Sequence, residues 1–269
     1  MMKPMPVFRS ALFTLSLALA ATGAMAQTTK PFEPVVSQPG KDVVWVPTPQ
    51  ALVDKMLDMA NVTPQDIVMD LGSGDGRTVI TAANRGARAH GIEYNPDMVE
   101  LSKRNAATAG VSDRATFEEA DLFQTDLSKA SVITLFLLPS INLQLRPTIL
   151  DLKPGTRIVS NTFNMDDWQP EEEATIPDCD RWCKALFWIV PARVEGTWRL
   201  PQGELTLKQD FQMLSGSLGA AQISNGKLRG EEISFRAGGA DYSGRVNGNR
   251  IQGTVKDADG KETAFTATR

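Results

Sequence analysis

This chain has few of the residues that metal sites and nucleic-acid-binding surfaces require. It contains one histidine, His90, and two cysteines, Cys179 and Cys183, so a zinc site is not expected. The formal net charge is −4 and no long block of like charges occurs, which argues against a nucleic-acid partner held by general electrostatics. After an apolar run near the N-terminus no second apolar span follows, so the sequence predicts no transmembrane segment in the mature chain.

The N-terminus has the pattern of an export signal. Lys3 and Arg9 give it a positive start, residues 11–21 form an apolar core, and Ala24-Met25-Ala26 is a small-x-small cleavage site before Gln27. The apolar run is shorter than the roughly 20 residues that a spanning helix requires. We therefore predict a Sec-type signal peptide and a mature protein in the periplasm of a Gram-negative bacterium, with an uncleaved anchor as the alternative.

The two cysteines would then lie in an oxidising compartment. The spacing of Cys179 and Cys183 fits a bridge in a turn or loop better than one in a regular helix. We predict a disulfide, and two free thiols are the alternative.

The most informative segment is a glycine-rich stretch after a short apolar run. Residues 67–69 are Ile-Val-Met, residues 70–77 are Asp-Leu-Gly-Ser-Gly-Asp-Gly-Arg, and residues 78–83 read as the opening of a helix. A strand, a glycine-rich turn and a helix N-terminus together form a unit that cradles nucleotides. Glu93 lies twenty-three residues after Asp70, at the end of a second expected strand, where an acid holds a ribose diol.

Spacing and charge then distinguish between possible ligands. The third glycine of a dinucleotide fingerprint would fall on Arg77, so the pattern here is G-x-G-x-G. Asp70 and Asp75 flank the loop and would repel a pyrophosphate. S-adenosylmethionine has no phosphate and carries an ammonium and a sulfonium, so the acids favour this cofactor over NAD.

The chain resembles the class I S-adenosylmethionine-dependent methyltransferases. Residues 70–77, 91–96 and 120–123 are similar to motif I, its following acid and the next cofactor motif. Residues 132–139, 143–146 and 152–160 are similar to the mitochondrial ATP-synthase c-subunit lysine methyltransferases and, more remotely, to the histone-lysine methyltransferases that lack a SET domain. The similarity covers about residues 44–168. It departs from the histone enzymes at Ile133 and Thr134, which stand near the place of an asparagine pair after strand four.

The resemblance implies a set of site residues. The cofactor-binding residues are expected to be Asp70, Gly72, Ser73, Gly74, Asp75, Gly76, Glu93, Asp121 and Leu122. Among these, Asp121 and Leu122 are expected at the adenine amino group and ring face. Leu138 and Pro139, next to Leu137, fall where the family places its methyl-acceptor pocket, although these apolar residues could equally be ordinary core.

Alternating strands and helices predict an α/β fold with a doubly wound, Rossmann-like, seven-stranded sheet. The expected elements are a helix over 50–60, strand 67–71, helix 77–84, strand 88–93, helix 96–109, strands 115–120 and 131–137, helix 140–151 and strand 156–163. A closing hairpin of 172–176 with 184–194 is expected to follow. This gives a signal peptide over residues 1–26 and a methyltransferase domain over residues 27–195.

The pattern of residue types changes at Gly196. Alternating apolar and polar segments follow, separated by glycine-containing pairs that predict tight turns at 215–216, 225–226, 238–239, 247–248 and 259–260. Residues 196–269 are therefore predicted to form a small all-β domain, an antiparallel barrel or sandwich.

The function that the sequence favours is an exported S-adenosylmethionine-dependent methyltransferase acting on a protein lysine. Residues 158–180 hold seven acids and no lysine or arginine, which could attract a cationic substrate or could be a solvated loop. The alternatives are methylation of a small molecule and a catalytically inactive exported protein that binds S-adenosylmethionine.

Overall fold

The computed structural model describes residues 1–3 and 32–269. The predicted cleavage site at Ala26, and all but the start of the predicted signal segment, lie outside the described residues. Among the residues that are described, no helix has both the length and the apolar character needed to cross a membrane.

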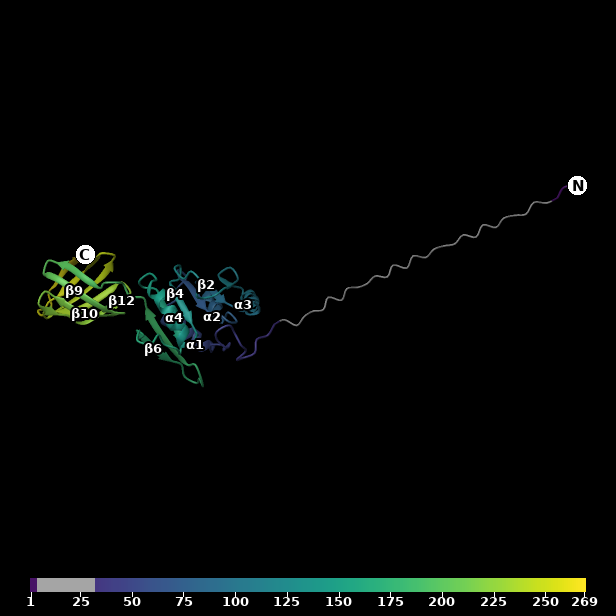
Figure 1. Ribbon diagram of the computed structural model, residues 1–269, viewed down its shortest axis with the longest axis horizontal. Coiled ribbons are helices and arrows are strands. Elements are labelled where there is room, and N and C mark those ends of the chain that lie inside the picture. Colours follow the sequence, from purple (N-terminus) through teal and green to yellow (C-terminus); the bar gives the residue numbers. More distant parts are fainter. Residues whose placement is uncertain (4–31) are drawn as a thin grey trace. The chain divides into compact units, whose positions relative to one another are not determined.

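The first sheet of the described chain has seven strands in the order β3-β2-β1-β4-β5-β7-β6. Three of them, β2, β4 and β6, are labelled in Figure 1. Its strands are β1 (Ile67–Leu71), β2 (Arg88–Glu93), β3 (Ala115–Glu119), β4 (Val132–Leu135), β5 (Arg157–Asn161), β6 (Glu172–Thr175) and β7 (Lys184–Ile189). Strands β1 to β5 pair in parallel, whereas β7 pairs antiparallel with both β5 and β6. The predicted doubly wound sheet with a closing hairpin is confirmed.

Helices cover both faces of this sheet: α1 (Gln50–Met59), α2 (Arg77–Asn84), α3 (Pro96–Thr108) and α4 (Pro139–Leu150). Successive strand residues point to opposite faces, so neighbours in β4 belong to different cores. Val132 packs in one core with buried residues of α1, α2 and α3. Ile133 packs in the other with Leu145 and Ile149 of α4. Burial on both faces explains why the central strands read as continuous apolar runs.

The start of α3 is determined locally by three successive residues. Pro96 is its first residue, and the Asn95 side-chain oxygen accepts hydrogen bonds from the backbone N–H groups of Asp97 at 2.9 Å and Met98 at 3.4 Å. This cap fixes the direction in which the chain leaves β2, directly after Glu93.

The second sheet is antiparallel and closes on itself, because β9 pairs with β10 as well as with β8. Its strands in the described chain are β8 (Gly196–Leu200), β9 (Gly203–Asp210), β10 (Met213–Leu218), β11 (Ala221–Gln222), β12 (Ser224–Arg229), β13 (Glu232–Ala237), β14 (Ala240–Asn247), β15 (Arg250–Lys256) and β16 (Glu262–Thr268). Alternate residues such as Ile233 and Phe235 fill its core. The chain passes from one sheet to the other between Ile189 and Gly196, and a domain boundary at residues 195–196 stays a prediction.

Two of the five predicted turns in this sheet were wrong. Gly216 lies inside β10 and Gly226 inside β12. A Cβ on Gly216 would come within 1.9 Å of the Thr206 carbonyl oxygen, and one on Gly226 within 2.5 Å of the Leu214 carbonyl oxygen. These glycines permit close approach of neighbouring strands rather than a reversal of the chain.

Candidate active site

The site lies at the carboxyl ends of β1 and β4, where the order of the parallel strands reverses. In open α/β sheets this reversal leaves a crevice in which ligands bind. The loop after β1 borders the crevice, and its glycines adopt left-handed conformations, with φ of 55° at Gly74 and 81° at Gly76. A Cβ on Gly74 would lie 2.6 Å from Nε1 of Trp45. The loop can therefore lie against this indole only because residue 74 has no side chain.

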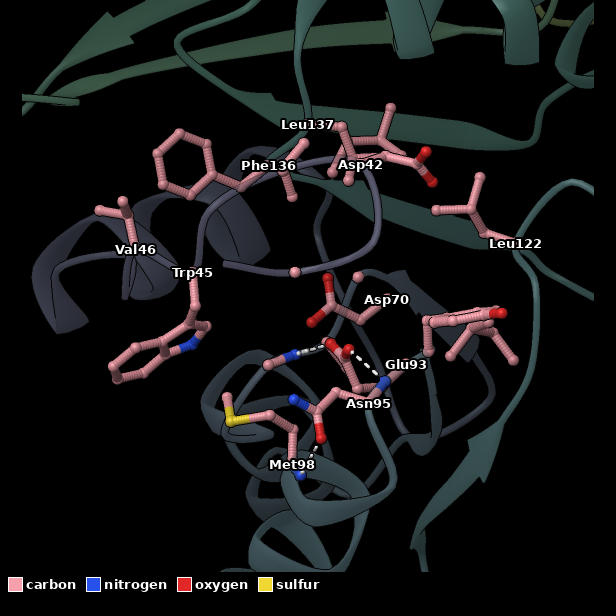
Figure 2. A pocket seen from close by; sticks show the side chains of 18 of the residues that line it. Asp42, Trp45, Val46, Asp70, Glu93, Asn95, Met98, Leu122, Phe136 and Leu137 are labelled. Carbon is pink, nitrogen blue, oxygen red and sulfur yellow. Dashed lines mark hydrogen bonds between the residues drawn. The ribbon is translucent and has the colours of Figure 1, made fainter. Parts of the chain in front are cut away.

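Glu93, at the end of β2, holds that loop. Its carboxylate accepts one hydrogen bond from the backbone N–H of Gly74 and one from the backbone N–H of Asn95, each 2.9 Å long (Figure 2). The carboxylate also lines the pocket. Glu93 is thus oriented by two backbone donors, with further acceptor capacity left on its oxygens.

Asp70, the last-but-one residue of β1, is a buried carboxylate in the same pocket. The Thr134 hydroxyl of the adjacent strand β4 donates a hydrogen bond to it over 2.5 Å. Burial raises the pKa of Asp70 to about 7, the Thr134 hydroxyl partly offsets this, and the negative charges of Asp75 and Glu93 raise it further. Figure 2 shows the Asp70 side chain between Glu93 on one side and Leu137 on the other.

The third acid of the motif has a different environment. Asp75 forms a two-pronged ion pair with Arg77, with Nη2 at 2.6 Å and Nε at 3.0 Å. Within the described part of the chain, no lysine or arginine forms an ion pair with Asp70 or Glu93. These two carboxylates are the acids left to meet a cationic ligand.

A segment before α1 folds across the pocket, and we call residues 37–48 the strap. The Ser37 N–H donates a hydrogen bond to the Trp45 carbonyl, 2.8 Å away, which closes a turn within the strap. The Lys41 ammonium lies 2.7 Å from Asp121 Oδ2 and 4.7 Å from the centre of the Tyr94 ring. The hydrogen bond from Lys41 holds the pKa of Asp121 below its usual range. Asp121, expected at the adenine amino group, therefore has one of its oxygens bound by the strap.

The structure brings most of the predicted site residues to one pocket, but not all of them. Asp70, Gly72, Ser73, Gly74, Asp75, Glu93, Asp121, Leu122 and Leu138 line it. Gly76 does not, because it is the residue before α2, where a Cβ would lie 2.8 Å from the Phe117 ring. Pro139 does not either, since it is exposed as the first residue of α4.

Several residues that the sequence did not assign to the site also line the pocket or hold its acids. Trp45 and Phe136 border the cavity, as do Phe163 and Trp182. Thr134 fixes Asp70. A lone threonine inside an otherwise apolar strand was a usable signal, because a buried hydroxyl needs a partner. The predicted bridge between Cys179 and Cys183 is confirmed, with a Cα–Cα distance of 5.8 Å, and it closes the loop that carries Trp182.

The residues present fit a cationic, phosphate-free nucleoside. A pyrophosphate would be repelled by the carboxylates of Asp70 and Glu93, which have no cationic partner among the described residues. A ligand with an ammonium and a sulfonium would supply a positive partner for these carboxylates. Hydroxyl groups of a ribose match the acceptor capacity that remains on Glu93.

Comparisons with known proteins agree with this chemistry. The family model of the ANTKMT methyltransferase domain matches residues 70–172. A protein-lysine N-methyltransferase of Saccharolobus islandicus is 42% identical over 139 residues, which are 51% of this chain and 86% of the relative. The mouse ATP synthase c-subunit lysine N-methyltransferase is 37% identical, and the match covers 39% of this chain and 42% of that protein. The chain thus spans most of the archaeal relative but less than half of the mouse one.

A solved structure is also similar to about half of the chain. The crystal structure of an RNA methyltransferase from Salinibacter ruber, in complex with S-adenosyl-L-homocysteine, has a TM-score of 0.53 and 44% sequence identity. The match covers 55% of this chain and 96% of that chain.

Proposed function

The chain belongs to the family of S-adenosylmethionine-dependent methyltransferases that includes the archaeal protein-lysine N-methyltransferase, and from this premise we propose that it methylates a lysine side chain of a protein. The cofactor supplies an electrophilic methyl group on a sulfonium. The observation that carries the proposal is one pocket with two kinds of lining. One is the pair of acids Asp70 and Glu93, and the other is a group of apolar and aromatic side chains that we call the apolar end, Phe136, Leu137, Leu138, Phe163 and Trp182.

The acids hold the cofactor in this proposal. Glu93 binds the ribose hydroxyls, Asp70 compensates the positive charge, and the loop from Gly72 to Gly76 supplies backbone next to the nucleoside. Asp121 and Leu122 form the adenine side. Binding of a cation stabilises the ionised form of Asp70, because an opposite charge lowers a carboxyl pKa.

The apolar end receives the acceptor. Leu137 is buried and Leu138 is exposed, and both line the pocket shortly after the end of β4. A lysine amine attacks only when neutral, and an apolar wall favours the neutral amine by withholding water from the ammonium. Transfer is an in-line displacement, so most of the acceleration comes from holding the amine and the methyl group at attacking distance.

Charge at the surface favours a cationic acceptor. Of the seven acids in residues 158–180, four are paired with cations elsewhere in the chain, Asp167, Glu171, Glu172 and Glu173. Asp178 and Asp180, in the loop that carries Trp182, are exposed and form no ion pair within the described residues. These carboxylates complement a basic peptide.

RNA is the second candidate acceptor, because the similar solved structure is that of an RNA methyltransferase. The net charge of −4 and the unpaired acids beside the pocket oppose this alternative, since RNA is held through its phosphates. The protein-lysine acceptor is therefore preferred.

Export is a further part of the proposal. It is supported by the sequence pattern of residues 1–26 and by the bridge between Cys179 and Cys183, a type of bond that persists in oxidising compartments. The acceptor is then a protein of the bacterial envelope.

The test is transfer of a radiolabelled methyl group by the purified chain from Gln27 onward. Envelope proteins, total RNA and a small-molecule extract serve as separate acceptors, and labelled proteins are mapped by mass spectrometry. We expect label on lysine, and none with the Asp70→Asn variant. Label in RNA or in the small-molecule fraction, with none on lysine, would refute the proposal.

A further inference from the structure

Three aromatic rings meet at the apolar end of the pocket, and we call Phe136, Phe163 and Trp182 the aromatic triad. They come from the residue after β4, the segment after β5 and the loop between β6 and β7. Their ring centres are 6.1 Å apart for the two phenylalanines, 5.8 Å for Phe136 and Trp182, and 5.2 Å for Phe163 and Trp182. All three line the cavity that contains Asp70 and Glu93.

The triad is held in place from two sides. The Phe163 carbonyl accepts hydrogen bonds from the Ser160 hydroxyl at 2.7 Å and from the buried Asn142 amide at 3.2 Å. Trp182 has a φ of 59°, a conformation that bulky residues rarely adopt, and it directly precedes Cys183 of the disulfide. The bridge closes a short loop around this residue and restricts the positions open to the indole.

The triad is not simply a part of the core. Trp182 retains 37% of its surface exposed, whereas Trp168, Trp188 and Trp198 are fully buried. An indole held at the mouth of a pocket in an unfavourable backbone conformation has no evident role in stability. Such outliers gather at functional sites, where the surrounding structure maintains them.

Positive charge is absent at this end of the pocket. Within the described residues, the cations that line the cavity are Lys41 and Arg77, and each is paired with an acid at the other end. Asp178 and Asp180 stand in the same loop as Trp182 and are exposed. An entering cation therefore meets aromatic rings and negative charge.

We propose that the aromatic triad is the recognition site for the lysine ammonium, with the disulfide loop as the element that positions Trp182. This inference rests on the proposed function. A cation over an aromatic face is attracted by the quadrupole of the ring, most strongly for tryptophan and on partial desolvation. The charged form is held at the mouth, and the amine gives its proton to solvent before it reaches Leu137 and Leu138.

The test measures binding without catalysis. The chain is labelled with 5-fluorotryptophan and saturated with S-adenosylhomocysteine, and the resonance of Trp182 among the five tryptophans is assigned with a Trp182→Leu variant. The probes are N-acetyl-trimethyllysine methylamide and its neutral isostere, in which a tert-butyl group replaces the trimethylammonium. We expect the cation to shift the Trp182 resonance and to bind about 2- to 30-fold more tightly than the isostere.

Two variants separate recognition from structure. Trp182→Leu is expected to reduce the preference for the cation, whereas Met213→Leu, at an exposed apolar residue of β10, leaves it unchanged. Cys179→Ser with Cys183→Ser retains the indole but frees its loop, so the preference falls by a smaller factor. Stability toward urea changes little, because closing so short a loop contributes little chain entropy.

The outcomes distinguish this inference from the proposed function. Equal affinity for the cation and the isostere, in a chain that labels lysine, would overturn the triad and leave the proposed function standing. Label on RNA and none on lysine, together with equal affinity for the two probes, would overturn both. Cation preference that survives in Trp182→Leu would remove Trp182 from the recognition site.

Discussion

Replacing Asp70 with asparagine is expected to stabilise the cofactor-free protein at high pH and to remove its affinity for the cofactor. Burial raises the pKa of Asp70 from 3.8 to about 7 in the folded state. Below pH 3.8 the carboxyl group is protonated in both states, so ionisation costs nothing. As the pH rises toward 7, the unfolded chain releases the proton more readily than the folded one. Stability then falls by about 4 kcal/mol in all, since each pH unit between the two pKa values contributes about 1.36 kcal/mol.

The Asp70→Asn variant removes this dependence but retains an oxygen that accepts the Thr134 hydrogen bond. Its new N–H₂ group adds a cost that does not vary with pH. The variant's free energy of unfolding minus that of the wild type should therefore rise by about 3 kcal/mol between pH 5 and pH 8.5. Urea unfolding without cofactor measures this difference, and Asp241→Asn, an exposed acid of β14, is the control that should show no rise. A flat difference for Asp70→Asn would refute the reasoning.

The cofactor affinity of the wild type should rise with pH, whereas its free energy of unfolding falls. A cation binds the ionised carboxylate, so affinity for S-adenosylmethionine, which carries the sulfonium, should fall by up to about tenfold for each pH unit below 7 in the wild type. Calorimetric titration from pH 5.5 to 8.5 measures this trend. A constant affinity over that range would show that Asp70 does not compensate the ligand's charge.

Three further outcomes are expected. Glu93→Ala should weaken binding of S-adenosylhomocysteine by about ten- to a hundredfold, the value of a charge-assisted hydrogen bond, and unchanged calorimetric affinity would remove Glu93 from the site. Leu138→Ser should leave that affinity unchanged and reduce methyl transfer in the radiolabel assay; an equal loss of both would place Leu138 in the cofactor site instead. The protein recovered from the envelope should begin at Gln27 on N-terminal sequencing, and a chain that retains Met1 would contradict the signal peptide.

The first sheet was predictable because local and global requirements agree there. Each parallel strand is short and followed by a turn or capping residue, as at Asn95, so its position can be inferred from a few neighbouring residues. The barrel was less predictable. Gly216 and Gly226 carry the sequence signal of a turn, yet their role depends on the strand that lies opposite, which the local sequence does not specify.

The same distinction between local and long-range determinants applies to the residues of the site. The loop from Asp70 to Gly76 and the acid at Glu93 form one contiguous supersecondary unit, so a motif predicts them together. Trp45 and Trp182 reach the pocket from segments more than a hundred residues apart. Their contributions depend on the fold of the strap and of the disulfide loop, and no spacing rule connects them. The ion pair between Lys41 and Asp121 could not be predicted for the same reason, since Lys41 lies eighty residues before Asp121.

Strand register explains how the Asp70 carboxylate is kept in a buried position where its charged form is unfavourable. Asp70 is paired with Gly91 of β2 and with Thr134 of β4, and the residues on either side of it, Met69 and Leu71, are buried. A one-residue slip would turn every side chain of β1 to the opposite face, so the apolar neighbours hold Asp70 in the cavity. The fold accepts an acid there at a cost of about 4 kcal/mol without a cation, and a cationic ligand removes that cost. A residue that conflicts with its surroundings until a ligand arrives marks a binding site, and Asp70 could be recognised as such from its place in an apolar strand.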